Sequence, residues 1–573
     1  MHETKKQFVG WVSGASVLLF YCWLLFIRST LGVFQNTHGF DPLAMINVLF
    51  PSFWFILLGY VSLGLLTIYF RLDRKFLHLL LLCGFALILY MTPFLLSGFS
   101  WSPDSLFHGG IAAYMPEILG GESLPLSGYA TSYPLSFIAT FLVEAGTGLT
   151  IFQYSLYVYP VISIIAFTLL AYSFISRLLG SSKAFVSMLI ALPALHFFEP
   201  HVSPFSFGTL LILASLITLT SGSQKMRILF FFSILAMVLT HPVSPISLGI
   251  FLVSALLIRF IGRPFTGRSE QDSNLVSNIS WRLMFVLGIV WVLWTLNWAT
   301  THYASVNYAI SKIVSLEFLQ DIRLIAEFTG SGFIYNDIQL LSLFIYAIFA
   351  IFDLTVFLFN VRKLRSDTQD SHVILQLFFS FSSILFAVFG YLLFLGTGEH
   401  VLLGRGLLFF ILNSAIAFTI QHYQNTPTNF QKVKLFLIFT LILFLCITFP
   451  LNSYSKEAYN THTPTSGAGL HFIGTNLDLS TQSISMAADR QLASYIDLNN
   501  GLILSSYPPN LTQVAPSYIA LRINSYFLIS MRYDFNFENN SFVQLRNTLE
   551  ANPTYNKIYT NSLFDIFAHN VKE

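Results

Sequence analysis

The stretch SGFSWSPDSLFHGGIAAYMPEILGGESLPLSGYATSYP, residues 97–134, lies between long apolar runs and carries acidic residues and a histidine but no lysine or arginine. Ser102 and Pro103 predict the start of a short helix, because serine caps a helix and proline fits its first turn. On that helix Asp104 and His108 stand four residues apart, so the carboxylate and the imidazole point the same way. The pair would share one proton or one ligand. The same two residues also fit an ordinary helix start at a membrane interface.

The composition around this stretch is that of a membrane protein. Of 573 residues, 55% are hydrophobic and only 10% are charged, which excludes an ordinary soluble globular protein. Apolar runs long enough to cross a bilayer predict about thirteen transmembrane helices. The predicted runs begin near Val9, Val48, Phe76, Tyr154, Ala184, Phe205, Ile228, Ile246, Leu283, Gln339, Val373, Leu407 and Leu435. We therefore expect an all-α polytopic fold.

The distribution of basic residues predicts the orientation, because cytoplasmic loops carry an excess of lysine and arginine. A cytoplasmic N-terminus places most of the basic residues that precede the C-terminal region on the cytoplasmic side. The opposite loops then hold only Arg28, Lys312, Arg323 and Arg405. The sequence thus predicts a multi-pass protein of the cell membrane, with the loop at residues 97–134 and the C-terminus outside.

Three parts follow from this pattern. Residues 1–75 are expected to add transmembrane helices at the front, and residues 76–450 to form the catalytic transmembrane core. Residues 451–573 are polar and contain short patterned segments, which predict a small extracytoplasmic α/β region.

Cys22 and Cys83 fall in predicted spans, as does the third cysteine, so no disulfide framework is expected. The formal net charge of +2 gives no reason to expect nucleic acid as a partner.

Two predicted external turns, FFEPHVSPF and LTHPVSPIS, carry histidine beside proline. Glu199 and His201 are two residues apart in the first turn, a spacing that lets both side chains reach one small cation. They are the candidate site for a divalent cation, Mg²⁺ or Mn²⁺. His241 in the second turn would lie at a similar depth and face the same external cavity as Asp104. Taken singly, each also fits an ordinary interfacial residue.

A third external loop, GTGEHVLLGRGLL, places Glu399, His400 and Arg405 just before a predicted helix. Arg405 is the only basic residue of that loop. A guanidinium at the membrane surface suits a phosphate oxygen far better than lipid tails. Its alternative role is to extend its charged end into the interface.

Together these features resemble the GT-C integral-membrane glycosyltransferases, which include protein O-mannosyltransferases, aminoarabinose transferases and oligosaccharyltransferases. The resemblance rests on Asp104 and His108 in the first external loop and on the segment YATSYPL at residues 129–135, with Tyr133 before an interfacial helix. Short helices and an external C-terminal tail follow. It implies that Asp104 is the catalytic base or a metal-site carboxylate and that Arg405 binds a lipid phosphate. The sequence departs from the mannosyltransferases at Ser105, where they have a second acidic residue.

The resemblance implies a membrane glycosyltransferase. It would transfer a sugar, with inversion, from a polyprenyl- or dolichyl-phosphate-linked donor to an acceptor glycan, lipid or protein at the external face. Asp104, oriented by His108, would take the acceptor's proton. Arg405, with His241 and the neighbouring Glu399, His400 and Tyr133, would bind the donor phosphate and substrate. Alternative interpretations are a transporter or lipid flippase, which calls for ionisable residues in mid-span, and a membrane receptor without catalytic activity.

Overall fold

The structure of the protein, a computed structural model, describes most of the helical part of the chain and short strands near its C-terminus. The described residues are 2–30, 49, 51–97, 105, 108, 109, 111, 112, 115–120, 127–149, 153–196, 198, 200–221, 223–262, 281–299, 311, 315, 334–364, 371–397, 400–423, 430–457, 484–486, 502, 503, 518–522, 555–561 and 564–569.

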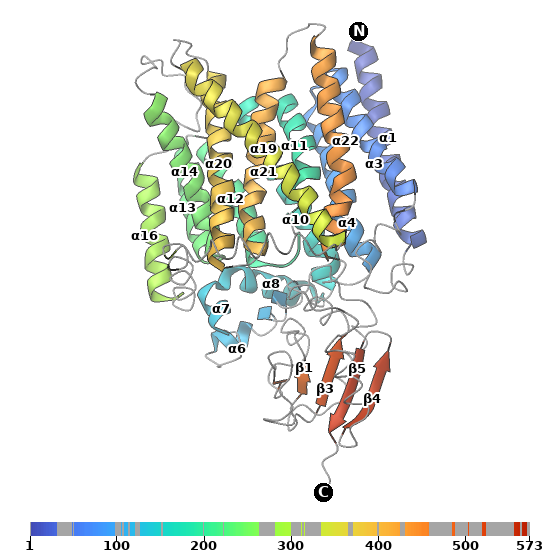
Figure 1. Cartoon of the computed structure of the whole chain (residues 1–573), viewed down its shortest axis with the longest axis vertical. Helices are drawn as coiled ribbons and strands as arrows, with labels where there is room; N and C mark the ends of the chain where they lie inside the picture. Colours follow the sequence, from blue (N-terminus) through green and yellow to red (C-terminus); the bar gives the residue numbers. More distant parts are fainter. Residues whose placement is uncertain are drawn as a thin grey trace.

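The described residues include eight helices that are long and apolar enough to cross a membrane. These are α1 (His2–Thr30), α3 (Pro51–Tyr69), α4 (Lys75–Ser97), α10 (Tyr159–Leu179), α14 (Val243–Gly262), α19 (Ile334–Leu364), α20 (Ser371–Thr397) and α21 (His400–His422). The chain is therefore a multi-pass membrane protein, as its composition predicted. Figure 1 shows these helices side by side in one bundle.

Shorter apolar helices complete the bundle, and the expected total of about thirteen transmembrane helices remains a prediction. They are α11 (Ser181–Ala194), α12 (Pro204–Leu219), α13 (Gln224–Val238) and α16 (Trp281–Asn297), with the apolar part of α22 (Phe430–Glu457). Of these, α11 is buried on all sides from Ala184 to Ala194, because α4, α10, α21 and α22 surround it. A helix that is apolar all round in this way belongs to the centre of a bundle.

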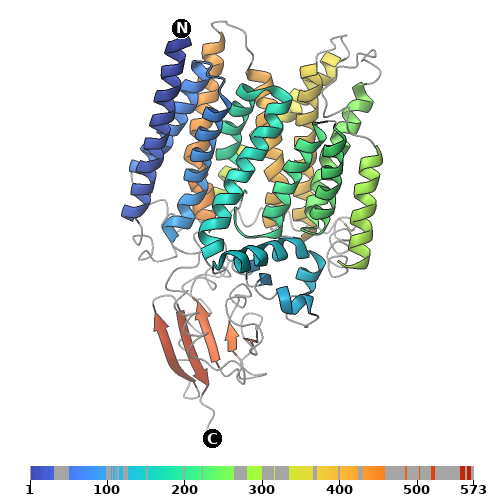
Figure 2. The same cartoon turned by 180° about the vertical axis from the view of Figure 1, so that it is seen from behind.

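One end of the bundle is covered by short helices that run across it: α6 (Met115–Leu119), α7 (Ser127–Ser132) and α8 (Pro134–Thr147). Figure 2 shows α8 lying across the ends of the spanning helices, which agrees with the interfacial helix expected there. Pro134 fits the first turn of α8, and Gly148 ends it in the left-handed conformation at φ 68°. The Leu135 N–H donates to the Leu239 carbonyl at 3.1 Å and ties α8 to the end of α13.

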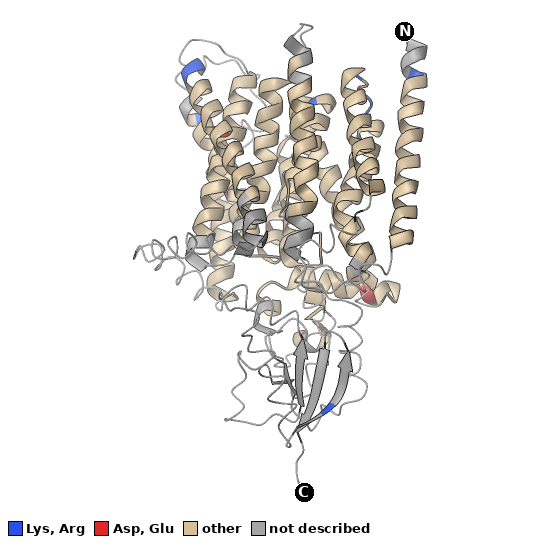
Figure 3. Ribbon diagram, turned by 45° about the vertical axis from the view of Figure 1, so that its right-hand side comes forward, with Lys and Arg blue, Asp and Glu red and all other residues tan. Residues whose placement is uncertain are grey.

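Most of the described lysine and arginine residues lie at the opposite end of the bundle, where the N-terminus also lies (Figure 3). They include Arg71, Arg74, Lys75, Arg177, Lys183, Lys225, Arg227, Arg259, Arg282, Arg362 and Lys363. Among the described residues, fewer lysines and arginines lie at the end covered by α8.

The described strands of the C-terminal region form one mixed sheet of order β2-β1-β3-β5-β4. Its strands are β1 (Ile484–Met486), β2 (Leu502–Ile503), β3 (Tyr518–Arg522), β4 (Tyr555–Asn561) and β5 (Phe564–His569). In Figure 1 the sheet lies beyond the end of the bundle that carries α8. The helical part of the expected α/β region lies outside the described residues.

A buried polar cluster joins three of the spanning helices. Asp353 on α19 is fully buried, and its Oδ2 accepts hydrogen bonds from Ser383 of α20 and Ser414 of α21, each at 2.5 Å. The two serine hydroxyls also lie 2.8 Å from one another and within 3.2 Å of the Phe410 carbonyl. Polar groups inside a membrane protein stabilise helix contacts when they bond to one another in this manner.

We expect Ser383→Ala to lower the free energy of unfolding by about 1–2 kcal/mol, because it removes a hydroxyl that bonds to Asp353. The measurement is thermal unfolding of the protein in lipid nanodiscs. Ser382→Ala is the matched control, since Ser382 is equally buried on the same helix but its hydroxyl has no hydrogen-bond partner among the described residues. Equal effects of the two substitutions would contradict the cluster's role.

Candidate functional site

The first turn of α12 forms the centre of the candidate site. Ser203, in extended conformation, caps this helix by accepting the Ser206 N–H on its Oγ at 3.1 Å, and Pro204 follows in the first turn. This local structure follows directly from the sequence Ser-Pro at the start of an apolar run. The cap fixes Phe205 on one face of the turn and Pro204 and Phe207 toward another.

His241 lies in the turn between α13 and α14 and is only 2% exposed. Its Nδ1 accepts the backbone N–H of Val243 at 3.2 Å, which holds the ring in place. The ring lies 5.5 Å from that of Phe205, in an edge-on contact. Gly208 makes this approach possible, because a Cβ there would collide with Ser244 Oγ of α14.

Arg405 reaches the same place from α21. The sequence predicted it just before a helix, but α21 already begins at His400, so Arg405 lies in its second turn. Its Nη1 is 3.1 Å from His241 Nε2, and its guanidinium carbon lies 5.2 Å from the centroid of the Phe205 ring. The structure thus brings together two predicted residues that are 164 positions apart, and the Phe205 ring packs against both.

The hydrogen bonds determine what this pair offers a ligand. The backbone N–H of Val243 lies 3.2 Å from His241 Nδ1 and Arg405 Nη1 lies 3.1 Å from Nε2, and a neutral imidazole accepts a hydrogen bond at only one of these nitrogens. Arg405 Nη1 can only donate, so its 3.1 Å contact with His241 Nε2 is a hydrogen bond in the tautomer in which that nitrogen accepts. The Nε of Arg405 is buried without a hydrogen-bond partner among the described residues. The other N–H groups of this guanidinium, with its positive charge, fit an anionic oxygen.

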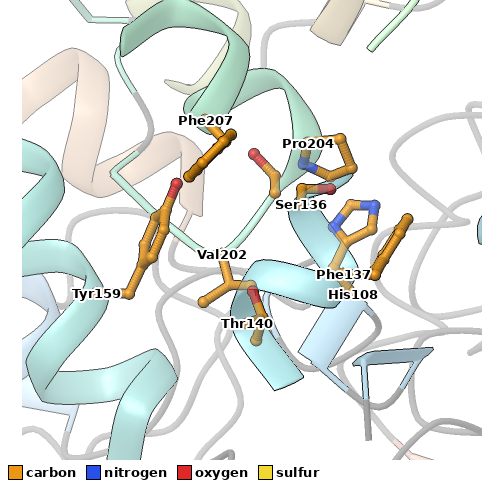
Figure 4. Close-up of a pocket in the computed structure, with 9 residues that line it drawn as sticks. His108, Ser136, Phe137, Thr140, Tyr159, Val202, Pro204 and Phe207 are labelled. Carbon is orange, nitrogen blue, oxygen red and sulfur yellow. The ribbon is translucent and has the colours of Figure 1, made fainter. Parts of the chain in front are cut away.

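A pocket lies against another face of the same α12 turn, between this turn and α8. It is lined by His108, Ser136, Phe137, Thr140, Tyr159, Val202, Ser203, Pro204 and Phe207. Figure 4 shows His108 and Phe137 on one side of the pocket and Tyr159 and Phe207 on the opposite side. Of the lining residues, His108 belongs to the acidic loop identified in the sequence, and its ring lies 5.9 Å from that of Phe137.

The described lining of the pocket is mainly apolar, and its polar groups are hydroxyls and one imidazole. Ser136 is 6% exposed, and its Oγ has no hydrogen-bond partner among the described residues. Tyr154 packs beneath the pocket with Tyr159 and Val202. Burial raises the pKa of Tyr154, while a hydrogen bond with Thr140 opposes that shift, so this neighbouring hydroxyl is neutral as well.

The structure describes only some of the remaining predicted site residues. Tyr133 is buried directly before α8, and His201 is buried two residues before the α12 cap; neither lines the pocket. His400 begins α21, but its side chain is not described. The other predicted residues, Asp104, Glu199 and Glu399, lie outside the described residues. Residue 105 and His108 are helical, as expected of a helix that begins near Pro103.

The metal prediction remains untested. No group of three or more histidine, cysteine, aspartate or glutamate residues comes together in the part of the chain that the structure describes. His201 is described there but its predicted partner Glu199 is not, so the fit of a divalent cation rests on the sequence alone.

Sequence reasoning missed Phe205, and of the pocket residues it identified only His108. Phe205 and Phe207 read only as part of an apolar run, and a single serine or tyrosine near a helix end carries no spacing signal. The Ser-Pro cap at Ser203 was the one local sign that a helix begins beside the predicted His201. Comparisons of the sequence with known protein families and with curated proteins find no match.

Proposed function

We propose that the chain is a membrane glycosyltransferase of the GT-C type. It transfers a sugar from a polyprenyl-phosphate-linked donor to an acceptor at the external face of the cell membrane. The end of the bundle that carries α8 is then the external face. The concentration of lysine and arginine at the opposite end supports this orientation, because cytoplasmic ends carry the excess of positive charge.

The observation that carries the proposal is the contact between Arg405 and His241 at a helix-covered end of a transmembrane bundle. The guanidinium of Arg405 lies beside the His241 imidazole, and its buried Nε has no hydrogen-bond partner among the described residues. No described acidic side chain forms an ion pair with this arginine. A lipid-linked phosphate supplies a negative charge that no described side chain provides, and it brings its own apolar chain.

The chemistry follows from this placement. Asp104 accepts the proton of the acceptor hydroxyl or amide while the acceptor's oxygen or nitrogen bonds to the anomeric carbon. The bond from that carbon to the phosphate oxygen breaks, and its electron pair remains on the phosphate. Arg405 and His241 stabilise the charge that develops there. A single displacement of this kind inverts the anomeric centre.

Asp353 is the observation that favours the alternative function, a transporter or flippase, because an ionisable residue inside a membrane span often marks a transport pathway. Its surroundings argue against that role. Asp353 is completely buried, and one carboxylate oxygen is bonded to two serines of neighbouring helices. The site at Arg405 is the better candidate because it lies near the end of its helix, where a substrate has access.

We expect Arg405→Ala to weaken the binding of a polyprenyl phosphate by about 10- to 100-fold, since hydrogen bonds to a charged group contribute roughly 1.5–3 kcal/mol. Arg405→Lys should restore only part of the affinity, because an ammonium cannot present two parallel N–H groups. The measurement is titration of the protein in nanodiscs with synthetic polyprenyl phosphate.

The matched control is Arg28→Ala, which removes an exposed arginine from the last turn of α1. This variant should bind the lipid as the wild type does. Unchanged affinity in Arg405→Ala, with the protein still folded, would refute the phosphate-binding role.

A further inference from the structure

We propose that Phe205 is a positioning residue for Arg405. Its ring holds the guanidinium where it binds a phosphate and leaves the positive charge available to that phosphate. This inference rests on the proposed function and deepens it, because it names a further residue on which the phosphate contact depends. Phe205 acts through Arg405 and is not itself a catalytic residue.

The contacts of the Phe205 ring are the first argument. The guanidinium carbon of Arg405 lies over the ring, 5.2 Å from its centroid, which is within the distance of about 6 Å for a cation–π interaction. The imidazole of His241 contacts the same ring edge-on at 5.5 Å. Arg405 Nη1 and His241 Nε2 are 3.1 Å apart. Each of the three groups therefore touches the other two, so loss of the ring frees both of the others.

The first turn of α12 fixes the place of the ring. The backbone on both sides of Phe205 is held by Ser203, whose Oγ accepts the Ser206 N–H at 3.1 Å and whose carbonyl accepts the Phe207 N–H at 3.2 Å. The turn also approaches His241 closely, since a Cβ built at Gly208 would lie 3.7 Å from His241 Cβ. The ring is thus presented from a capped helix start rather than from a loose loop.

Arginine needs such support because its side chain is long and has many rotamers. A guanidinium that moves freely loses this freedom when it binds a ligand, and the loss weakens binding. A ring that already holds the guanidinium in the bound position removes part of that cost. The affinity for phosphate should therefore depend on Phe205 even though the phosphate contacts Arg405.

The kind of contact is the second argument. An aromatic face attracts a cation through its quadrupole and uses none of the N–H groups of the guanidinium. The hydrogen bond from Nη1 to His241 Nε2 requires a neutral imidazole, since a protonated one has no acceptor nitrogen. Both contacts therefore hold the guanidinium without cancelling its charge. A carboxylate would hold it more firmly, but would compete with the phosphate for the same donors.

The test begins with Phe205→Leu and Phe205→Met, which keep an apolar side chain at this half-buried position but remove the aromatic face. We expect each to weaken polyprenyl phosphate by about 2- to 10-fold in nanodisc titrations, the value of one partly shielded cation–π contact. Binding of uncharged polyprenol should not change, because the contact acts on the charged group. Phe205→Tyr keeps the face and should bind the phosphate as the wild type does.

Phe352→Leu is the matched control. Phe352 on α19 is also half-buried, and its ring also lies beside a histidine, 5.9 Å from the ring of His422. This histidine lies in the last turn of α21, whereas Arg405 lies near the start of that helix. Phe352→Leu should leave polyprenyl phosphate binding unchanged.

A double-mutant cycle shows whether Phe205 acts through Arg405. In an Arg405→Ala background, Phe205→Leu should cause no further loss of phosphate affinity, because there is no guanidinium left to hold. A loss of the same size in both backgrounds would mean that Phe205 only packs the helix, and would overturn the proposal. Unchanged affinity in Phe205→Leu and Phe205→Met, with Arg405→Ala weakened, would overturn it as well and leave the proposed function standing.

NMR of the protein with isotope-labelled arginine tests the contact without any lipid. The Arg405 signal, identified by its absence in Arg405→Lys, should shift in Phe205→Leu because the ring current of Phe205 is lost, and should stay in place in Phe205→Tyr. An Arg405 signal that is the same in Phe205→Leu and the wild type would overturn the proposal. Unchanged phosphate affinity in Arg405→Ala would instead refute the proposed function, so the two failures are distinguishable.

Discussion

Replacing Gly406 with alanine should destabilise the protein more than the same replacement at any other glycine that the structure describes. A Cβ at this position would overlap Gly390 Cα and lie 2.6 Å from the Gly390 nitrogen and 2.8 Å from the Phe386 carbonyl oxygen. All three atoms belong to the backbone of α20, so no side chain can turn away to make room. The helices α20 and α21 would have to separate.

We expect this separation to lower the free energy of unfolding by about 3 kcal/mol or more, the upper range for an overpacked interior. Because Gly406 is next to Arg405, the shift would also move the guanidinium away from His241 and weaken polyprenyl phosphate binding. Thermal unfolding and lipid titration in nanodiscs measure the two effects.

Gly249→Ala is the control, since nothing lies within 4 Å of a Cβ built at Gly249 on α14. Alanine there should leave stability unchanged or raise it, because alanine favours a helix by up to about 1 kcal/mol over glycine. A Gly406→Ala protein as stable as wild type would mean that the two helices do not approach so closely.

Replacing Asp104 with asparagine should reduce sugar transfer by about 10²- to 10⁴-fold, the usual loss when a general base is removed. Asparagine is nearly isosteric and still caps a helix, so an aspartate that merely begins a helix would tolerate this change. An amide cannot take the acceptor's proton. His108→Gln should have a smaller effect, because the imidazole positions the carboxylate or the acceptor rather than accepting the proton.

Transfer from a synthetic polyprenyl-phosphate sugar by the purified variants is the measurement, with thermal unfolding recorded on the same samples. We expect Asp104→Asn to lose nearly all sugar transfer and to unfold at the same temperature as the wild type. Full turnover in Asp104→Asn would remove Asp104 from the mechanism.

The sequence predicted much of the transmembrane architecture because long apolar runs need no tertiary information to be recognised. The positions of α4, α10, α14 and α20 agree with the runs read near Phe76, Tyr154, Ile246 and Val373. The short helices were harder to assign, because an apolar run of 14 residues that contains one proline, as in α11, fits a buried helix and a span equally well. Burial inside the bundle, which decides between them, is a property of the whole fold.

For the candidate site too, the sequence identified single residues but not the contacts between them. Arg405 and His241 were each selected for their chemistry at a helix end, but their contact depends on how α14 and α21 pack. The helix predicted from the apolar run near Leu407 begins earlier in the structure, because α21 starts at His400. The pocket residues Ser136 and Phe207 gave no sequence signal, since their role arises only where α8 crosses α12.

The measurement that tests the central claim most directly is mass spectrometry of lipid-linked sugars and glycans in cells that lack this chain. The account predicts that one polyprenyl-phosphate sugar accumulates and that one cell-envelope glycan, lipid or protein loses a single sugar. Wild-type chain should restore both signals, and the Asp104→Asn and Arg405→Ala variants should not. Unchanged lipid-linked sugars and glycans in the deletion cells would contradict the proposal that this protein is a glycosyltransferase.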